Sequence, residues 1–510
     1  MMGLAAVFCC FAYSHGMISF ETKDALESSM EWVLKHWLLI LLLTAYTVFL
    51  LTNAYRGAIR SEGITDFFVG GRQMGGIAIG VSFFATFAST NSYIGHAGKA
   101  YAYGAPWLIM AAMLVLFSYF SWRWIGPAVR EMAGRWDALT IPDLLGSLYE
   151  PEKTGNVGPV RILSAVVIVF SSLLYLIAIF KGAGHLFEQF LGVPYEVAVG
   201  ITLAIVVAYT SIGGFVSVVR TDILQGILMV LGSITIFYFV TEAAGGVTSI
   251  SRLADNPETD FVFEWNGGIP FAVLIGIALS GALKLLVDPR QVSRFYALRD
   301  ERALKQGMWV AVAGLAIVQF CIFPVGLYAH LLMDGVTDTD VIVPTLINRE
   351  TIFPVWASDF LILAIVAAAM SSMDSVLLVA SSTLYKNLVM PFRPSRNPLT
   401  FTRVVVIGTA IFSAILALNP PGDIVEITIF SGSLYAVCFF PAIVIGIHWN
   451  KRYSPAVIGS MLIGVATLLI WIYLGLRSIV HEVFPALIIS VAVFCFISML
   501  SRVSLNDNSQ

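Results

Sequence analysis

The stretch Ala367–Leu388, AAAMSSMDSVLLVASSTLYKNL, is an apolar segment of helix length with polar residues at its centre. On a 3.6-residue period, one helical face is shared by Ala368, Ser371, Ser372 and Ser375. An aspartate at mid-membrane costs roughly 3 kcal/mol on insertion scales, so we expect Asp374 to face a cavity or a partner rather than lipid. The stretch therefore predicts a buried polar site. The alternative interpretation is a packing face, because serine commonly joins membrane helices.

The composition is that of a polytopic membrane protein. Of 510 residues, 58% are hydrophobic and 12% are charged, and the mean hydropathy is +0.86. The length therefore indicates many membrane-spanning helices rather than several soluble domains. A net charge of -3 without a basic block gives no indication of nucleic acid as a partner. The five cysteines lack metal-ligand spacing and are expected to serve packing.

The two ends of the chain are expected to lie outside the helical core. Residues 1–35 form an outer, periplasmic or extracellular leader that we leave unassigned, because the apolar run Leu4–Tyr13 is too short to span and no Lys or Arg precedes it. A weak signal sequence, an unstructured leader and a start at Met30 all fit this pattern. Residues 501–510 are predicted to be a cytoplasmic tail.

Apolar windows of spanning length predict thirteen transmembrane helices. They are 36–54, 75–103, 106–127, 160–190, 194–213, 215–242, 269–288, 304–331, 354–388, 400–418, 423–447, 455–475 and 479–500.

Lys and Arg set the orientation, because positive charge stays on the cytoplasmic side of the membrane. With the N-terminus outside, 21 of the 29 Lys and Arg residues fall on inner segments, six on outer segments, and Lys181 and Lys284 within spans. The inner group includes Arg290 and Arg294, in the predicted loop 288–304. We therefore predict an integral inner (plasma) membrane protein with its N-terminus outside and its C-terminus in the cytoplasm.

The second span is unusually polar. Its sequence, GVSFFATFASTNSYIGHAGKAYAY over Gly80–Tyr103, gathers Thr86, Ser89, Thr90, Asn91 and Ser92 at mid-depth. These residues are indifferent or unfavourable in a helix interior. A broken helix whose freed carbonyls line a cavity accounts for them, and a closely packed continuous helix is the alternative.

Three further charged residues have two interpretations each. Asp222 is either a structural charge paired with a nearby arginine or a cation ligand, and its spacing favours the structural role. Lys181 either snorkels to the outer surface or meets a substrate carboxylate. Lys284, near the inner boundary, is expected to snorkel.

Four stretches together resemble the sodium:solute symporter family. They are ATFASTNSYIGHAGKAYAYG in the second span, YTSIGGFVSVVRTDILQG at 209–226, DPRQVSRFYALRDERAL at 288–304, and the opening stretch. The resemblance runs in unbroken order from about Phe67 to Arg452. It implies an all-α fold of the leucine-transporter type, with two inverted repeats of five helices. The implied parts are a flanking helix at 36–54, the repeats at 75–242 and 269–447, and two C-terminal helices at 455–500.

The resemblance implies one sodium site and raises the question of a second. The first would use carbonyls of Ala85, Ala88 and Ala368 and hydroxyls of Ser371 and Ser372. A second, present in some members, would use Asp222 with Ser371, Asp374 and Ser375. An aspartate here replaces a serine of the family pattern at position 374, so one sodium between two carboxylates leaves an unbalanced charge. Protonation of Asp374 or a nearby Lys or Arg would compensate.

The resemblance also implies a substrate site at mid-membrane, beside the broken helix. By position its candidates are Asn91, Ser92, Tyr175, Lys181, Ser280, Ser431, Ser433 and Tyr435. The stretch TIFSGSLYAVCFFPAIVIG at 428–446 looks closer to the pantothenate, proline and monocarboxylate branches of the family than to its sugar branch.

We therefore expect a secondary transporter, not an enzyme, that uses Na+ as coupling ion to import a small organic solute by alternating access. The solute is expected to be a carboxylate or amino acid, and no obligate protein partner is evident. One alternative is an intramembrane enzyme that uses Asp222 and Asp374 as a carboxylate pair. The other is a solute sensor without transport, for which the short tail leaves no signalling domain.

Overall fold

The structure is a computed structural model that describes residues 31–32, 34–60, 63–151, 157–266, 268–449 and 452–500. Most of the predicted leader 1–35 and the predicted tail 501–510 lie outside these residues.

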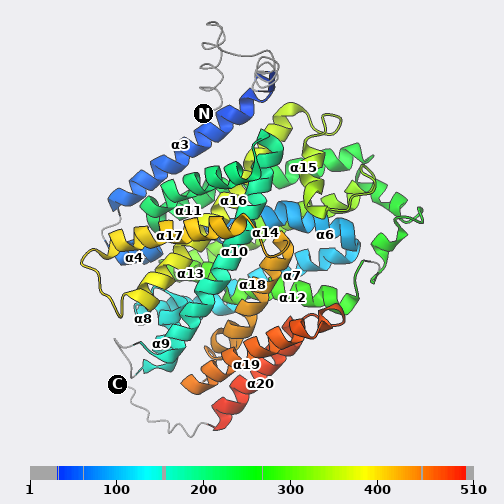
Figure 1. Ribbon diagram of the computed structural model, residues 1–510. Coiled ribbons are helices and arrows are strands. Elements are labelled where there is room, and N and C mark those ends of the chain that lie inside the picture. The colour runs from blue at the N-terminus through cyan, green and yellow to red at the C-terminus, as the bar shows by residue number, and fades with distance from the viewer. Residues whose placement is uncertain are drawn as a thin grey trace.

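The described chain is helical (Figure 1). Its α-helices are α3 (Trp37–Arg60), α4 (Ile64–Val69), α5 (Gly76–Phe87), α6 (His96–Tyr103), α7 (Leu108–Phe120), α8 (Gly126–Arg135), α9 (Ile141–Tyr149), α10 (Pro159–Leu191), α11 (Tyr195–Ala243), α12 (Phe271–Val287), α13 (Pro289–Ala297), α14 (Glu301–Ala329), α15 (Ile342–Ile347), α16 (Val355–Thr383), α17 (Pro398–Ala417), α18 (Ile424–Phe439), α19 (Ser454–Tyr473) and α20 (Val483–Leu500). Short 3₁₀ or π turns join or extend them: η1 (Gly70–Arg72), η2 (Asn91–Gly95), η3 (Ala105–Trp107), η4 (Ser121–Ile125), η6 (Val247–Leu253), η7 (Asp260–Phe263), η8 (Thr339–Val341), η9 (Leu384–Val389), η10 (Phe440–Ile445) and η11 (Leu476–Ser478).

The number of membrane-spanning segments agrees with the sequence prediction. Eleven helices of the described chain are long and apolar enough to cross a membrane, and the bent pair Gly76–Phe87 and Asn91–Tyr103 adds a twelfth. Helix α11 has 49 residues, roughly 74 Å at 1.5 Å per residue, which is too long for one crossing of a hydrocarbon layer about 30 Å thick. It breaks at Gly214, whose φ of 63° and ψ of -170° lie outside the helical region. Two spans therefore meet there, and the total is thirteen.

Helix α16 lies at the centre of the bundle. The whole apolar window of its span, Val355–Val389, is buried inside the protein, whereas the windows of α3 and α20 are each 28% buried. Helices α19 and α20 pack on each other at the edge of the bundle, next to α18 (Figure 1). The polar centre of the opening stretch, from Ser371 to Ser375, is therefore surrounded by protein, as its polar residues require.

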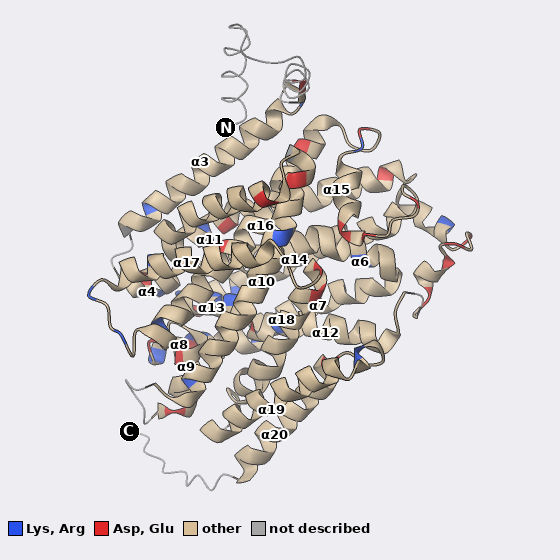
Figure 2. Cartoon of the chain, viewed as in Figure 1, with Lys and Arg blue, Asp and Glu red and all other residues tan. Residues whose placement is uncertain are grey.

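The short helix α13 is buried along its full length and held at both ends. At its N-terminus, the Asp288 carboxylate accepts the backbone N–H of Arg290 at 2.9 Å. At its C-terminus, the Met74 N–H donates to the Ala297 carbonyl at 2.9 Å, and the Arg299 N–H donates to the Met74 carbonyl at 3.2 Å. This fixed helix carries Arg290 and Arg294 into the protein interior. Figure 2 shows blue segments beside the α13 label, whereas most charged segments lie in loops or at helix ends.

Candidate functional site: two buried charged clusters

The second span is broken, as predicted. Helix α5 ends at Phe87, and a second helical segment, Asn91–Tyr103, follows at an angle of 57° to it. A helix end leaves its last carbonyls without helical partners. Here the Ser372 hydroxyl lies 3.0 Å from the Thr86 carbonyl oxygen and 3.4 Å from that of Ala88. The serine face of α16 therefore meets the break in α5.

All five residues predicted for the first sodium site are fully buried near this break: Ala85, Ala88, Ala368, Ser371 and Ser372. Only the hydroxyl of Ser372 contacts the broken helix directly. The Ser371 hydroxyl instead donates to Asp222 Oδ1 at 2.6 Å. Thr86, which contributes a carbonyl, was not among the predicted ligands.

Asp222 receives three donors. Besides Ser371, the Ser82 hydroxyl lies 2.5 Å from Asp222 Oδ2 and the Arg294 guanidinium lies 3.3 Å from the same oxygen. Both charged side chains are fully buried. Asp222 is therefore paired with an arginine, Arg294, and its role as a cation ligand stays a prediction.

Asp374 has weaker contacts. The Tyr209 hydroxyl lies 3.2 Å from Asp374 Oδ2 and the Ser375 hydroxyl lies 3.2 Å from Asp374 Oδ1. The residue is fully buried on the centrally placed helix α16. Its contacts in the described chain are hydroxyl groups, so no cation balances its charge directly.

Arg294 lies among the residues predicted to bind a second sodium. Its Nη2 lies 2.6 Å from Ser375 Oγ and 2.7 Å from Thr86 Oγ1, and its Nε lies 3.1 Å from Ser82 Oγ. We call Asp222, Asp374, Arg294, Ser371 and Ser375 the cation cluster. The prediction that Arg290 and Arg294 belong to an inner loop was wrong, because both are at most 2% exposed within α13.

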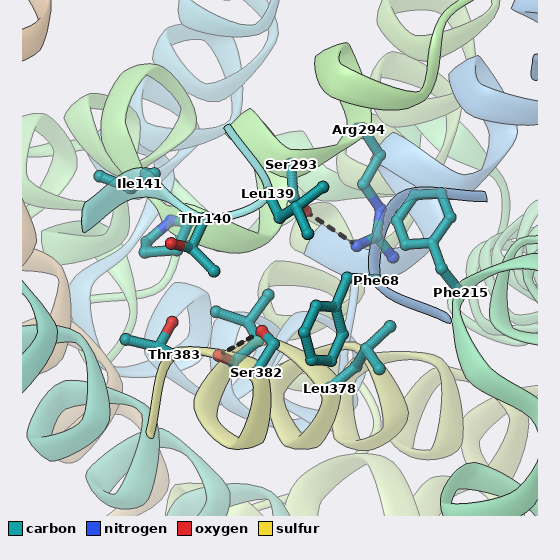
Figure 3. A pocket seen from close by; sticks show the side chains of 12 residues that line it. Phe68, Leu139, Thr140, Ile141, Phe215, Ser293, Arg294, Leu378, Ser382 and Thr383 are labelled. Atoms are coloured by element: carbon teal, nitrogen blue, oxygen red, sulfur yellow. Dashed lines mark hydrogen bonds between the residues drawn. The ribbon is translucent and has the colours of Figure 1, made fainter. Parts of the chain in front are cut away.

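A small cavity of about 20 Å³ lies against Arg294 (Figure 3). Its walls include Phe68, Phe215 and Ser382, and Arg294 Cζ lies 5.4 Å from the Phe215 ring centroid. Figure 3 shows Arg294 beside the Phe215 ring, with α16 on the opposite side of the cavity. The volume matches about one water molecule.

A second cluster surrounds the ring of Tyr175. Lys284 Nζ lies 4.1 Å and Arg290 Cζ 4.0 Å from the ring centroid. Arg290 is also paired with Asp288, with Nη2 2.5 Å from Oδ2. The prediction that Lys284 snorkels to the surface was wrong, because it is only 3% exposed. Tyr175, Lys284, Arg290 and Asp288 are called the Tyr175 cluster.

Most of the predicted substrate residues are buried near the Tyr175 cluster. Ser280 and Ser433 share a hydrogen bond of 2.9 Å, and Gly432, between Ser431 and Ser433, faces Ser280 and the Lys284 stem. The Tyr435 hydroxyl lies 3.0 Å from Ser172 Oγ, and Ser431 donates to the Ser171 carbonyl at 3.1 Å.

The two candidates on the broken helix lie next to the break. Asn91 Nδ2 lies 3.2 Å from His96 Nε2, and Ser92 Oγ lies 3.4 Å from the Ser89 N–H. The Tyr175 hydroxyl lies 3.3 Å from Ser89 Oγ, so the break touches the Tyr175 cluster as well as the cation cluster.

Lys181 lies apart from these residues. It lines a separate cavity of about 150 Å³ together with Asp338, Asp340 and Asp423, and it donates to the Gly422 carbonyl at 3.3 Å. Burial raises the pKa of the Asp340 carboxyl, and the charge of Asp423 raises it further. The acidic residues around Lys181 therefore disfavour the binding of a substrate carboxylate at this lysine.

Comparison with known proteins assigns the chain to a family. Residues 67–464 match the sodium:solute symporter family. The chain belongs to this family. It is therefore a membrane transporter rather than an enzyme, and sodium is its coupling ion.

This symporter is 27% identical to the sodium/pantothenate symporter of Haemophilus influenzae, over 86% of this chain and 91% of the relative. It is also 27% identical to the osmoregulated proline transporter OpuE of Bacillus subtilis, over 91% and 95% of the two chains.

Solved structures support the fold of this symporter. A substrate-bound, outward-open Na+-coupled sialic acid symporter matches with a TM-score of 0.78 at 20% identity, over 91% of this chain and 98% of that one. The nucleobase-cation-symport-1 family transporter Mhp1 matches with a TM-score of 0.53 at 12% identity, over 85% and 94%. The predicted all-α fold of the leucine-transporter type is thus confirmed. In the part of the chain that the structure describes, His, Cys, Asp and Glu side chains form no group of three that could hold a metal ion.

Proposed function

We propose that this symporter imports a small carboxylate or amino acid with sodium bound where α16 meets the broken α5. The observation that carries the proposal is the contact of the Ser372 hydroxyl with the Thr86 and Ala88 carbonyls at the 57° bend. Sodium is a hard cation and prefers oxygen ligands, as does Ca²⁺ or Mg²⁺. An unwound helix offers such oxygens without polar side chains. The proposed ligands are Ala85, Ala88, Ala368, Ser371 and Ser372.

Charge supports an anionic group on the substrate. In the Tyr175 cluster, Arg290 and Asp288 balance each other. Lys284 is buried over the Tyr175 ring, and no carboxylate of the described chain lies within salt-bridge distance of it. A buried charge is stabilised by an opposite one. We propose that Lys284, rather than Lys181, meets a substrate carboxylate. The relatives named for pantothenate and proline are consistent with this class, since both solutes carry a carboxylate.

The polar side chains near Lys284 are proposed to complete the substrate site. Gly432 lies against both Ser280 and the Lys284 stem, Ser433 shares a hydrogen bond with Ser280, and Tyr175 provides the ring under the Lys284 ammonium group. Asn91, Ser92, Ser431 and Tyr435 form the wider neighbourhood, as the sequence suggested.

We further propose that the protein resides in the plasma (inner) membrane with its N-terminus outside and its C-terminus in the cytoplasm. The excess of Lys and Arg on one set of connections supports this orientation. We propose that the two inverted repeats are residues 75–242 and 269–447, and that movement of one repeat against the other exposes the site to each side of the membrane in turn. No obligate protein partner is required for this cycle.

The sodium site is tested by uptake of labelled pantothenate and labelled proline into proteoliposomes, with and without a sodium gradient. Ser372→Ala is expected to weaken the sodium dependence at least tenfold and to leave the choice of solute unchanged. Ser413→Ala is the matched control, because its hydroxyl bonds to Thr409 of its own helix, α17. An unchanged sodium requirement in Ser372→Ala would remove this assignment.

A further inference from the structure

The guanidinium of Arg294 contacts two of the four side chains predicted to bind a second sodium. Four side-chain oxygen atoms of different residues lie within 3.3 Å of its nitrogen atoms, and all four residues are buried. They are Ser82 Oγ, Thr86 Oγ1, Asp222 Oδ2 and Ser375 Oγ. Two of these residues, Asp222 and Ser375, are among the ligands predicted for a second sodium. A positive group already occupies that position.

The formal charges of the cation cluster point to the same conclusion. With both carboxyl groups ionised, the buried Asp222 and Asp374 contribute two negative charges, and the buried Arg294 contributes one positive charge. One sodium ion at the break of α5 therefore makes the cluster neutral. A second sodium would leave a buried positive charge in excess, which is unfavourable in a low-dielectric interior.

Arg294 is also held in place by its own helix. Its Nη1 lies 3.2 Å from the Arg290 carbonyl, and both ends of α13 are fixed by Asp288 and by the Met74 backbone. A sodium ion would have to displace a guanidinium that is attached to a buried, anchored helix. A covalently attached ligand competes at high effective concentration.

We propose that Arg294 is a tethered cation that takes the place of a second sodium, so that this symporter binds one sodium ion per chain. Asp374 is the counter-charge that matches this single ion. Arg294 is thus a positioning residue that sets the number of coupling ions. The proposal rests on the sodium site proposed above.

The first test is a count of bound ions. Purified full-length protein in lipid nanodiscs is titrated with ²²Na+ to saturation. The expected result is about one ion per chain with a Hill coefficient of about 1. Two ions per chain would overturn the proposal. Ser372→Ala tests the proposed site separately: if it binds sodium like the wild type, the assignment of the first site fails, whatever the ion count.

The second test removes the tethered cation. Arg294→Gln leaves Asp222 and Asp374 without a positive partner, and the saturating count is expected to rise from one ion to two. A folded Arg294→Gln protein that still binds one ion with unchanged affinity would contradict the proposal. Arg299→Gln is the matched control, because Arg299 is about half exposed and bonds to Asp300 in the same segment. Its ion count should stay at one.

A double variant keeps the proposal testable if Arg294→Gln alone does not fold. Asp222→Asn with Arg294→Gln removes one charge of each sign and leaves Asp374 as the counter-charge. This protein is expected to bind one sodium ion, and a count of two would overturn the charge argument.

Discussion

The cation cluster and the Tyr175 cluster both combine carboxylates with basic side chains, but their formal net charges are opposite. The cation cluster has two carboxylates and one guanidinium, whereas the Tyr175 cluster has an ammonium, a guanidinium and one carboxylate. Their formal charges are therefore of opposite sign and equal size. One region suits a sodium ion and the other suits an anionic solute group. Each is unsatisfied alone, so binding in one region is expected to favour binding in the other.

Helix α13 connects the two regions. It sends Arg290 to the Tyr175 cluster and Arg294 to the cation cluster, four residues apart on one helical face. The Tyr175 hydroxyl provides a second connection through Ser89 at the break of α5. A shift of α13 or of the break therefore changes both clusters together. Coupling between two ligands is reciprocal, so the solute must tighten sodium binding as much as sodium tightens solute binding.

The largest expected effect comes from breaking the ion pair of the cation cluster. Asp222→Asn leaves the Arg294 guanidinium buried without its partner, which costs about 3–5 kcal/mol of stability. The double variant Asp222→Asn with Arg294→Gln should recover much of this loss. Thermal unfolding in detergent measures both. Equal destabilisation of the single and double variants would contradict the pairing.

The next largest effect is expected on solute binding alone, from a change in the Tyr175 cluster. Lys284→Gln removes the positive charge proposed to meet the solute carboxylate, a charge-assisted contact worth about 1.5–3 kcal/mol, or roughly 10- to 150-fold in affinity. Sodium binding without solute should change far less. The measurement is the KM for labelled solute beside ²²Na+ binding to the same protein. Lys284→Arg keeps the charge and should retain part of the affinity.

A smaller effect is expected from loosening the connection between the clusters. Tyr175→Phe keeps the ring under Lys284 and Arg290 and removes the hydroxyl contact with Ser89. We expect a loss of about 0.5–1.5 kcal/mol, or roughly 2- to 13-fold, in the sodium-induced gain of solute affinity. Solute titrations at low and high sodium give this gain. A change in solute affinity that is equal at both sodium levels would mean that the hydroxyl does not serve coupling.

The smallest effect is expected outside both clusters. Lys181→Ala removes a charge that is already surrounded by acidic groups, so solute affinity near neutral pH should change by less than about threefold, or ~0.7 kcal/mol. Because the pKa of Asp340 is raised, this carboxyl takes up a proton at a higher pH than an ordinary aspartate. Its charge is lost early as the pH falls, and any effect of Lys181→Ala should then grow. Solute uptake as a function of outside pH measures this, and a large effect at neutral pH would restore Lys181 as a substrate residue.

The fold could be predicted from the sequence because membrane spans and polar interruptions are local signals. The thirteen spans, the break after Phe87 and the burial of Asp374 all follow from apolar length and from the cost of polar groups in lipid. The contact of Ser372 with the broken helix also followed, through the family pattern.

The partners of the buried charges could not be predicted in the same way. Arg290 and Arg294 stand in a stretch of mixed polarity, DPRQVSRFYALRDERAL, which has the composition of an inner loop. Only the fold shows that α13 turns back into the bundle, where Arg294 meets Asp222, 72 residues away in sequence. The same holds for Lys284, which has the sequence position of a snorkelling lysine but lies over Tyr175. The sequence nevertheless indicated a nearby cation twice, through the unbalanced charge of Asp374 and through the expected arginine partner of Asp222.

The tethered arginine bears on how much solute the cell can accumulate. If one sodium ion travels with one monocarboxylate, no net charge crosses the membrane. The membrane potential, worth about 2.3 kcal/mol per charge per 100 mV, then does no work on the cycle. The sodium concentration ratio alone sets the limit, so a tenfold ratio supports about tenfold accumulation, or ~1.4 kcal/mol. For a monocarboxylate, Arg294 would thus give lower concentrating power together with uptake that persists when the membrane is depolarised.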